Sequence, residues 1–205
     1  MGLRTMLRLK PSLPPECARW FEGKEFTSDW LSTKLASWVQ TLSALRGTAR
    51  AVLDIGSYEG RSAIAFLELF PQASVTSIDL FDSTEVEARF DRNLAPYGER
   101  IVKIKSRAVP ALDRLRSERQ SFDAIYLDAG KRRDETLAQS TLAWPLLRTG
   151  GILIWDDLVW KPHLPDDRRP GPGIELFAKM FAGCLEELHR DKQLIVRKTS
   201  DWPGA

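Results

Sequence analysis

The chain has 205 residues, 43% of them hydrophobic and 28% charged, a balance typical of one soluble globular domain with a sizeable core. Its formal net charge of +2 does not support a dedicated nucleic-acid surface, and no apolar run is long enough to span a bilayer. The two cysteines, Cys17 and Cys184, can form at most one bridge, and we interpret both as reduced thiols of a cytoplasmic protein. Residues 1–10 are basic but lack the hydrophobic core of a secretory signal.

The N-terminal part of the chain is expected to contain one main helix. Prolines interrupt residues 1–25, so little regular structure is predicted there. Apolar residues then recur at helical spacing from Trp30 to Leu45, with a polar capping run at 27–29 before them and Gly47 after them. This pattern predicts one helix over residues 30–45.

Strand and helix signals alternate through the rest of the chain. Short β-rich runs are separated by amphipathic stretches, the pattern of a doubly wound α/β sheet with mostly parallel strands. Strands are predicted at 51–54, 74–79, 101–105, 122–127 and 152–155, and helices at 63–70, 83–97, 109–117, 129–147 and 174–181. A proline- and glycine-rich loop precedes the last helix, and two short β-rich runs at 184–188 and 193–197 predict a closing antiparallel hairpin.

Residues 51–62 lead from a strand through a glycine turn into a helix, the layout of a nucleotide-binding crevice. Gly56 lets the chain turn off the strand, and Gly60 lets the helix lie close to a ligand. The acid Asp54 precedes a G-x-x-x-G run, whereas a dinucleotide fingerprint would be G-x-G-x-x-G without that acid. An acid here suits a ligand with a cationic group. Asp79, at the end of the next strand, is placed to accept hydrogen bonds from ribose hydroxyls, although a cap of the strand end is the alternative.

Three carboxylates follow two strands that are expected to be neighbours in the sheet. Asp128 ends one strand, and Asp156 and Asp157 end the other, at the edge where open α/β sheets bind ligands. Carboxylates this close repel one another unless a cation or a proton is present, and such oxygen-rich sites suit Mg²⁺. The alternative, that Asp156 and Asp157 only cap the following turn, stays open.

The run DIGSYEGRSA at residues 54–63 resembles motif I of class I S-adenosylmethionine-dependent methyltransferases. The chain is most similar to the catechol and caffeoyl-CoA type O-methyltransferases, from about residue 52 to 160 and more weakly to 198. The resemblance implies a Rossmann-like fold and S-adenosylmethionine as cofactor. The cofactor-binding residues that it implies are Asp54, Gly56, Ser57, Tyr58, Gly60, Ser62, Asp79, Leu80, Ser106, Arg107 and Asp128.

The same resemblance extends to the carboxylates. The run 126–131 resembles the motif in which an Asp binds a divalent metal and a Lys three positions later is the general base, which implies catalytic roles for Asp128 and Lys131. The run 154–157 resembles the motif that supplies the second and third metal ligands, here Asp156 and Asp157. The family usually has Asn at the third position, so Asp157 adds a negative charge.

The general base has alternatives. Nearby Arg132 and Arg133, together with a metal, are expected to lower the pKa of Lys131 and make it a usable base near neutral pH. A solvated charge run is an equally good interpretation of these cations. His163, in the long loop, is the alternative base.

We therefore predict an S-adenosylmethionine-dependent, Mg²⁺-dependent O-methyltransferase that acts on a hydroxyl of a small molecule, catechol-like or a natural product. The alternatives are a catalytically silent S-adenosylmethionine-binding protein and a nicotinamide-dependent oxidoreductase, which the missing G-x-G-x-x-G disfavours. Trp30, Tyr58 and Trp160 are candidates to stack on an aromatic substrate, or are equally core residues. No nucleic-acid or membrane partner is expected, and a homodimer is left open.

The prediction is of a single methyltransferase domain over residues 1–205. Its parts are the N-terminal helical cover (1–46), the cofactor-binding core (51–160), a substrate loop (161–173), and the C-terminal helix and hairpin (174–205).

Overall fold

The most apolar runs of the sequence form the central strands of the sheet. Their side chains are buried on both faces, as is usual for parallel strands. The computed structural model describes residues 14–202, so the expectations for residues 1–13 and 203–205 lie outside it. The strands are β1 (Ala51–Ile55), β2 (Ser74–Asp79), β3 (Ile101–Lys105), β4 (Phe122–Leu127), β5 (Leu147–Trp155), β6 (Leu185–Arg190) and β7 (Leu194–Lys198).

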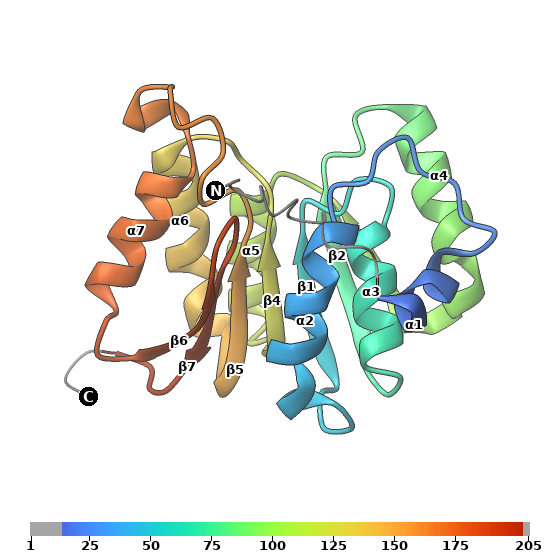
Figure 1. Cartoon of the computed structure of the whole chain (residues 1–205), viewed down its shortest axis with the longest axis horizontal. Coiled ribbons are helices and arrows are strands. Elements are labelled where there is room, and N and C mark those ends of the chain that lie inside the picture. The colour runs from blue at the N-terminus through green and yellow to red at the C-terminus, as the bar shows by residue number, and fades with distance from the viewer. Residues whose placement is uncertain (1–13, 203–205) are drawn as a thin grey trace, which may run out of the picture.

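The strand order in the sheet is β3-β2-β1-β4-β5-β7-β6 (Figure 1). Strands β1 to β5 pair in parallel, whereas β7 pairs antiparallel with both β5 and β6. The predicted Rossmann-like, doubly wound, mostly parallel sheet with a C-terminal antiparallel hairpin is therefore confirmed. The order reverses between β1 and β4, and ligands of open α/β sheets bind outside the carboxyl ends of the strands at such a reversal.

Helices cover both faces of the sheet (Figure 1). The α-helices are α1 (Pro15–Ala18), α2 (Leu35–Thr41), α3 (Arg61–Leu69), α4 (Thr84–Leu94), α5 (Ala108–Ser117), α6 (Arg133–Ala143) and α7 (Gly171–Met180). Short 3₁₀ helices are η1 (Arg19–Phe21), η2 (Ser32–Lys34), η3 (Ser43–Leu45), η4 (Ala95–Arg100), η5 (Trp144–Leu146) and η6 (Asp166–Arg168). None of the described helices is both long and apolar enough to cross a membrane.

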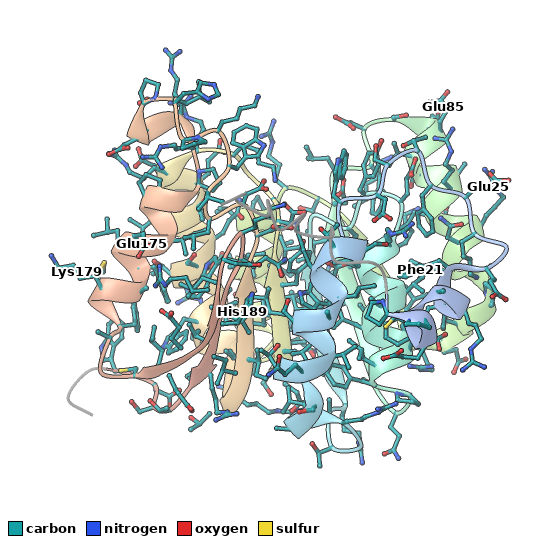
Figure 2. All side chains as sticks on the ribbon, in the orientation of Figure 1. Phe21, Glu25, Glu85, Glu175, Lys179 and His189 are labelled. Carbon is teal, nitrogen blue, oxygen red and sulfur yellow. The ribbon has the colours of Figure 1, made fainter. Side chains whose placement is uncertain are left out.

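The sheet separates two hydrophobic cores, because successive side chains of a strand point to opposite faces. Val52 of β1 packs in one core with α2 and α3, and the next residue, Leu53, packs in the other with α5, α6 and α7. Side chains fill both layers, whereas Glu175 and Lys179 of α7 lie on its outer, exposed side (Figure 2). The two cores fix the strand ends on which the candidate site depends.

The prediction of one continuous helix over residues 30–45 is wrong. The segment forms η2, α2 and η3 in succession, and Trp30 lies before the first of them. Asp29 Oδ1 accepts the backbone N–H groups of Leu31 and Ser32 at 3.2 and 2.9 Å, so Asp29, in the predicted capping run at 27–29, caps the start of this segment. The Ser37 hydroxyl donates to the Lys34 carbonyl near the junction of η2 and α2. Such bonds from a short polar side chain to a nearby backbone group compete with the hydrogen bonds of a regular helix.

Several other predicted boundaries differ from the observed ones, and three of them bear on the candidate site or its sheet. The helix predicted at 129–147 is shorter in the structure, where it forms only α6. Gly130, near the predicted start, has a left-handed φ of +76°, and Pro145, two residues after the end of α6, does not continue an α-helix. Strand β5 begins at Leu147, five residues earlier than predicted. The predicted loop 161–173 becomes helical at Gly171, because a proline is tolerated in a first helical turn.

Candidate active site

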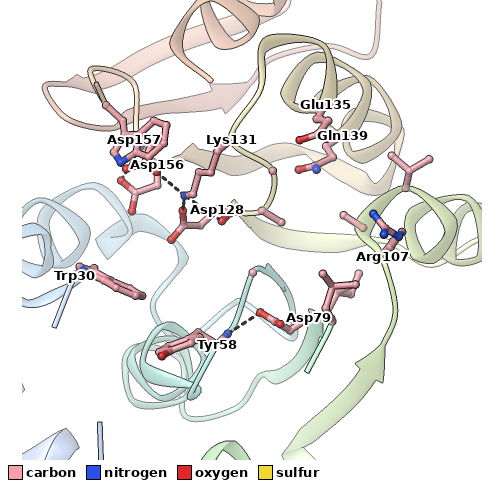
Figure 3. A pocket seen from close by; sticks show the side chains of 18 of the residues that line it. Trp30, Tyr58, Asp79, Arg107, Asp128, Lys131, Glu135, Gln139, Asp156 and Asp157 are labelled. Atoms are coloured by element: carbon pink, nitrogen blue, oxygen red, sulfur yellow. Dashed lines mark hydrogen bonds and ion pairs between the residues drawn. The ribbon is translucent and has the colours of Figure 1, made fainter. Parts of the chain in front are cut away.

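A cleft of about 1050 Å³ opens at the carboxyl ends of β1, β2, β3, β4 and β5 (Figure 3). It therefore lies at the edge that the reversal of strand order marks as the ligand-binding edge. Most of the predicted site residues line it together: Gly56, Tyr58, Asp79, Leu80, Ser106, Arg107, Asp128, Lys131, Asp156 and Asp157.

The remaining predicted cofactor residues lie beneath or beside the cleft. Asp54 is fully buried, and its Oδ2 accepts the Ser62 hydroxyl at 2.8 Å, while the Ser57 hydroxyl donates to the Asp54 carbonyl at 3.1 Å. Gly60 has a left-handed backbone and is the N-terminal cap of α3. Burial, opposed by the two serine hydroxyls, raises the pKa of Asp54 to about 7. In this structure Asp54 therefore supports the loop from below rather than lining the cleft.

The glycine turn is held between β2 and β4. The Asp79 carboxylate accepts the backbone N–H of Tyr58 at 2.8 Å and that of Phe81 at 3.1 Å, so it ties the turn to the end of β2 (Figure 3). Gly56 has a φ of +92°, and a Cβ added there would lie 2.7 Å from the carbonyl carbon and oxygen of Asp128. Because Gly56 has no side chain, the glycine turn after β1 can pack directly against the backbone that follows β4.

The three predicted metal ligands are bound by side chains of the chain itself. Lys131 Nζ donates to Asp128 Oδ1 at 2.6 Å and to Asp157 Oδ2 at 2.5 Å (Figure 3). Asp156 forms an ion pair with Lys34. Three carboxylates and two ammonium groups, those of Asp128, Asp156, Asp157, Lys34 and Lys131, thus form one acid–ammonium group at the ends of β4 and β5.

In this structure the pKa of Lys131 is raised, whereas the sequence led us to expect a lowered value. Desolvation lowers this pKa, but the negative charges of Asp128 and Asp157 outweigh it and raise the pKa well above its usual value. The two arginines that motivated the expectation are directed elsewhere, because Arg132 pairs with Asp167 and Arg133 pairs with Asp134. Lys131 is therefore an ammonium near neutral pH.

The pKa of Asp128 shifts in the direction that suits a proton acceptor. Burial raises it to about 6, the charge of Asp156 adds to this rise, and the Lys131 ammonium opposes it. His163, the alternative base from the sequence, is exposed and is not among the residues that line the cleft.

The arrangement does not fit a bound Mg²⁺ ion. Mg²⁺ requires several oxygen ligands that converge on one point with near-octahedral geometry. Within residues 14–202, no group of three or more His, Cys, Asp or Glu side chains is placed to hold a metal ion. The physical reason is that the Lys131 ammonium lies between Asp128 and Asp157, and Asp156 is directed to Lys34.

Sequence reasoning missed two residues of this group. The Tyr126 hydroxyl donates to Asp156 Oδ2 at 2.5 Å and lies 3.3 Å from Asp128 Oδ2. Its position two residues before Asp128 in a strand was a signal, since such residues share one face of the sheet. Lys34 gave no local signal, because it meets Asp156 across 122 positions of the chain.

The N-terminal segment forms one wall of the cleft through Asp29, Trp30, Thr33 and Lys34. Trp30 is 61% exposed and packs on Tyr58 with ring centroids 5.3 Å apart, so it is not a core residue. Trp160 also lines the cleft.

A buried carboxylate anchors this wall. Glu59 is 1% exposed and accepts the backbone N–H and the hydroxyl of Thr27 at 2.6 and 2.9 Å. Arg89 pairs with the same carboxylate at 3.2 Å. The wall is therefore attached to the start of α3 and to α4.

Comparison with known proteins relates the chain to methyltransferases. A curated O-methyltransferase, ankF of Aspergillus thermomutatus, is 31% identical over 165 residues, which are 72% of this chain and 63% of that protein. The O-methyltransferase TomG of Streptomyces achromogenes, involved in tomaymycin synthesis and solved with SAM, has a TM-score of 0.68 at 22% identity, over 90% of this chain and 88% of that chain.

The methyltransferase MycE from the mycinamycin biosynthetic pathway, solved with Mg and SAH, also has a TM-score of 0.68, at 19% identity over 96% of this chain and 57% of that one. At these identities the solved structures show a shared fold. The chain spans less than two thirds of the curated relatives that it matches. The model of the family described as "Methyltransferase domain" matches residues 53–158, just over half of the chain, from β1 to the end of β5. The chain that builds this cleft therefore belongs to the methyltransferase domain family, as the resemblance of its glycine turn implied.

Proposed function

We propose that this chain transfers the methyl group of S-adenosylmethionine to a hydroxyl oxygen of a small molecule. One observation carries the proposal: a single cleft holds both the predicted cofactor residues around Asp79 and the acid–ammonium group around Lys131. A methyl donor and its acceptor can therefore meet in one space. The family match and the O-methyltransferase relatives support the same reaction.

The reaction balances without a further reactant. The acceptor oxygen forms a bond to the methyl carbon, the bond from that carbon to the sulfonium sulfur breaks, its electron pair stays on sulfur, and the hydroxyl proton leaves. Much of the acceleration would come from holding the two reactants in line in one cleft. S-adenosylmethionine supplies the activated methyl group.

The side chains of the cleft divide the remaining work. Asp79 accepts hydrogen bonds from the ribose of the cofactor. The Lys131 ammonium faces the acceptor and stabilises the negative charge that develops on its oxygen. Asp128, which is hydrogen-bonded to Lys131, accepts the hydroxyl proton. Lys131 thus acts as a cation, and the base is the neighbouring carboxylate.

The acceptor that fits best is aromatic. Trp30 and Trp160 both line the cleft and offer ring surfaces for stacking. A catechol-like or hydroxylated natural product has the required ring and hydroxyl. Magnesium is not part of this proposal, because the three carboxylates already have cationic partners.

Thermal unfolding with S-adenosylmethionine, S-adenosylhomocysteine or NAD tests the cofactor. A ligand at about 100 times its dissociation constant adds roughly 2.7 kcal/mol. For a chain of this size that raises the unfolding midpoint by roughly 5–10 °C. We expect a rise with both sulfur ligands and none with NAD. A rise with NAD alone would contradict the proposal.

Methyl transfer from labelled S-adenosylmethionine to a panel of catechols and hydroxylated natural products then tests catalysis. Labelled product is the expected result. Tight binding of S-adenosylmethionine without methyl transfer to any acceptor would favour a catalytically silent cofactor-binding protein instead.

A further inference from the structure

Two lysine side chains neutralise the carboxylates that the sequence predicts as metal ligands. The Lys131 ammonium binds Asp128 and Asp157 at 2.6 and 2.5 Å, and the Lys34 ammonium binds Asp156 (Figure 3 shows Lys131). Each carboxylate thus has a cationic partner from the chain itself. Three negative and two positive formal charges leave one net negative charge, a sign that favours a sulfonium cation in the same cleft.

Asp156 has the most complete set of partners in this group. Its Oδ1 accepts the backbone N–H of Asp157 at 2.7 Å, and its Oδ2 accepts the Tyr126 hydroxyl at 2.5 Å in addition to Lys34. Its side chain is only 2% exposed. A metal ion could bind Asp156 Oδ2 only by displacing Lys34 or Tyr126, and breaking a buried ion pair is strongly unfavourable.

The packing of α2 holds Lys34 over the cleft. Trp38, one helical turn after Lys34, is fully buried and stacks on Phe66 with ring centroids 4.6 Å apart. The Trp38 indole N–H also donates to Gln193 Oε1 at 2.9 Å. The Lys34 side chain is only 13% exposed, so most of it is enclosed by the fold.

We propose that Lys34 and Lys131 take the place of a divalent metal ion in this site, so that methyl transfer by this chain needs no metal. Lys34 is a positioning residue that holds Asp156, and Lys131 presents its ammonium to the acceptor oxygen. A fixed ammonium stabilises a developing oxyanion by the same electrostatic effect as a metal ion. This inference rests on the proposed function, because it describes how the same cleft activates its acceptor.

Metal binding by the full chain, without cofactor or acceptor, is the first test. The wild type is titrated with Mn²⁺ and followed by electron paramagnetic resonance, and with Mg²⁺ by calorimetry. We expect no saturable binding of either ion in the millimolar range. The double variant Lys34→Met and Lys131→Met is expected to bind Mn²⁺, because its three carboxylates have lost their ammonium partners.

The matched control is Lys192→Met. Lys192 lines the same cleft but forms no ion pair with residues 14–202, so removing its charge is expected not to create Mn²⁺ binding. Saturable Mn²⁺ binding by the wild type would overturn the inference. A folded double variant that does not bind Mn²⁺ would overturn it as well. The wild-type titration decides the matter even where the double variant does not fold.

Turnover is the second test. We expect the wild type to have the same kcat/KM in excess EDTA and in Mg²⁺. Lys34→Met is expected to lose turnover and to regain part of it when Mg²⁺ is added, whereas Lys34→Arg keeps its turnover in EDTA. Loss of wild-type turnover in EDTA and its recovery with Mg²⁺ would overturn the inference.

The two tests separate this inference from the proposed function. An absence of methyl transfer with and without Mg²⁺ would contradict the proposed function alone, since the Mn²⁺ titration needs no acceptor. Transfer that depends on Mg²⁺ would confirm the proposed function and overturn the role of the lysines.

Discussion

The substitution Gly56→Ala tests whether the glycine turn joins the two halves of the cleft. Gly56 has a φ of +92°, and an added Cβ would meet the Asp128 carbonyl carbon and oxygen at 2.7 Å and the Ala129 nitrogen at 3.0 Å. All three neighbours are backbone atoms, so no side chain can rotate away. Either the turn or the end of β4 has to move.

The cost of this change has two parts. A left-handed backbone costs an alanine roughly 1–2 kcal/mol, and overpacking against fixed atoms costs roughly 1–3 kcal/mol more. Gly47→Ala is the matched control, because Gly47 has a φ of +87° and nothing within 4 Å of an added Cβ. The gain from restricting the unfolded chain is the same in both variants and cancels in the comparison.

Urea unfolding followed by the fluorescence of the seven tryptophans measures both variants. We expect Gly56→Ala to be less stable than Gly47→Ala by roughly 1–3 kcal/mol, which corresponds to a thermal unfolding midpoint roughly 2–12 °C lower for a chain of this size. Affinity for S-adenosylhomocysteine should fall only in Gly56→Ala, since only that change displaces Asp128. Equal losses of stability in the two variants would refute the contact with β4.

Three further changes probe the site and its wall. Asp79→Asn should weaken binding of S-adenosylhomocysteine by about tenfold or more in calorimetry, because a hydrogen bond to a charged group contributes roughly 1.5–3 kcal/mol. Unchanged affinity would exclude Asp79 from the ribose site. Glu59→Gln should lower stability by about 2 kcal/mol and speed proteolysis of the N-terminal wall, since Thr27 and Arg89 lose a buried anionic partner. A wall that is still protected would contradict this anchor. Burial raises the pKa of Asp54 from 3.8 to about 7, so the folded chain holds a proton that the unfolded chain releases, and stability should fall as pH rises between these values. Unfolding midpoints across that range should show this part of the fall in the wild type and not in Asp54→Asn, and parallel profiles would contradict the raised pKa.

The sequence by itself determined the sheet and the place of the cleft. The strands β2, β3 and β4 begin and end where the β-rich runs predict, because a period of two and continuous apolar burial are local properties of the chain. Ser83 stands at the start of the helix predicted over 83–97, and its side chain caps α4 by accepting the backbone N–H of Val86. Asp79 is the last residue of β2 and Asp128 directly follows β4, so the strand predictions were enough to place both.

Local patterns failed where short polar side chains compete with the backbone ladder. The apolar spacing from Trp30 to Leu45 predicts one helix, but the segment is divided into η2, α2 and η3, and the Ser37 hydroxyl bonds back to the Lys34 carbonyl at the first junction. Trp30 and Lys34 lie on the wall of the cleft.

Only the tertiary structure decided the chemistry of the carboxylates. The sequence neighbours of Lys131 are arginines, which favour a lowered pKa, yet Asp157, 26 positions later, binds its ammonium and helps to raise that pKa. Lys34 reaches Asp156 across 122 positions. The pKa of an ionisable group depends on the charges near it and on how far it is removed from water. Both depend on which distant parts of the chain pack around the group.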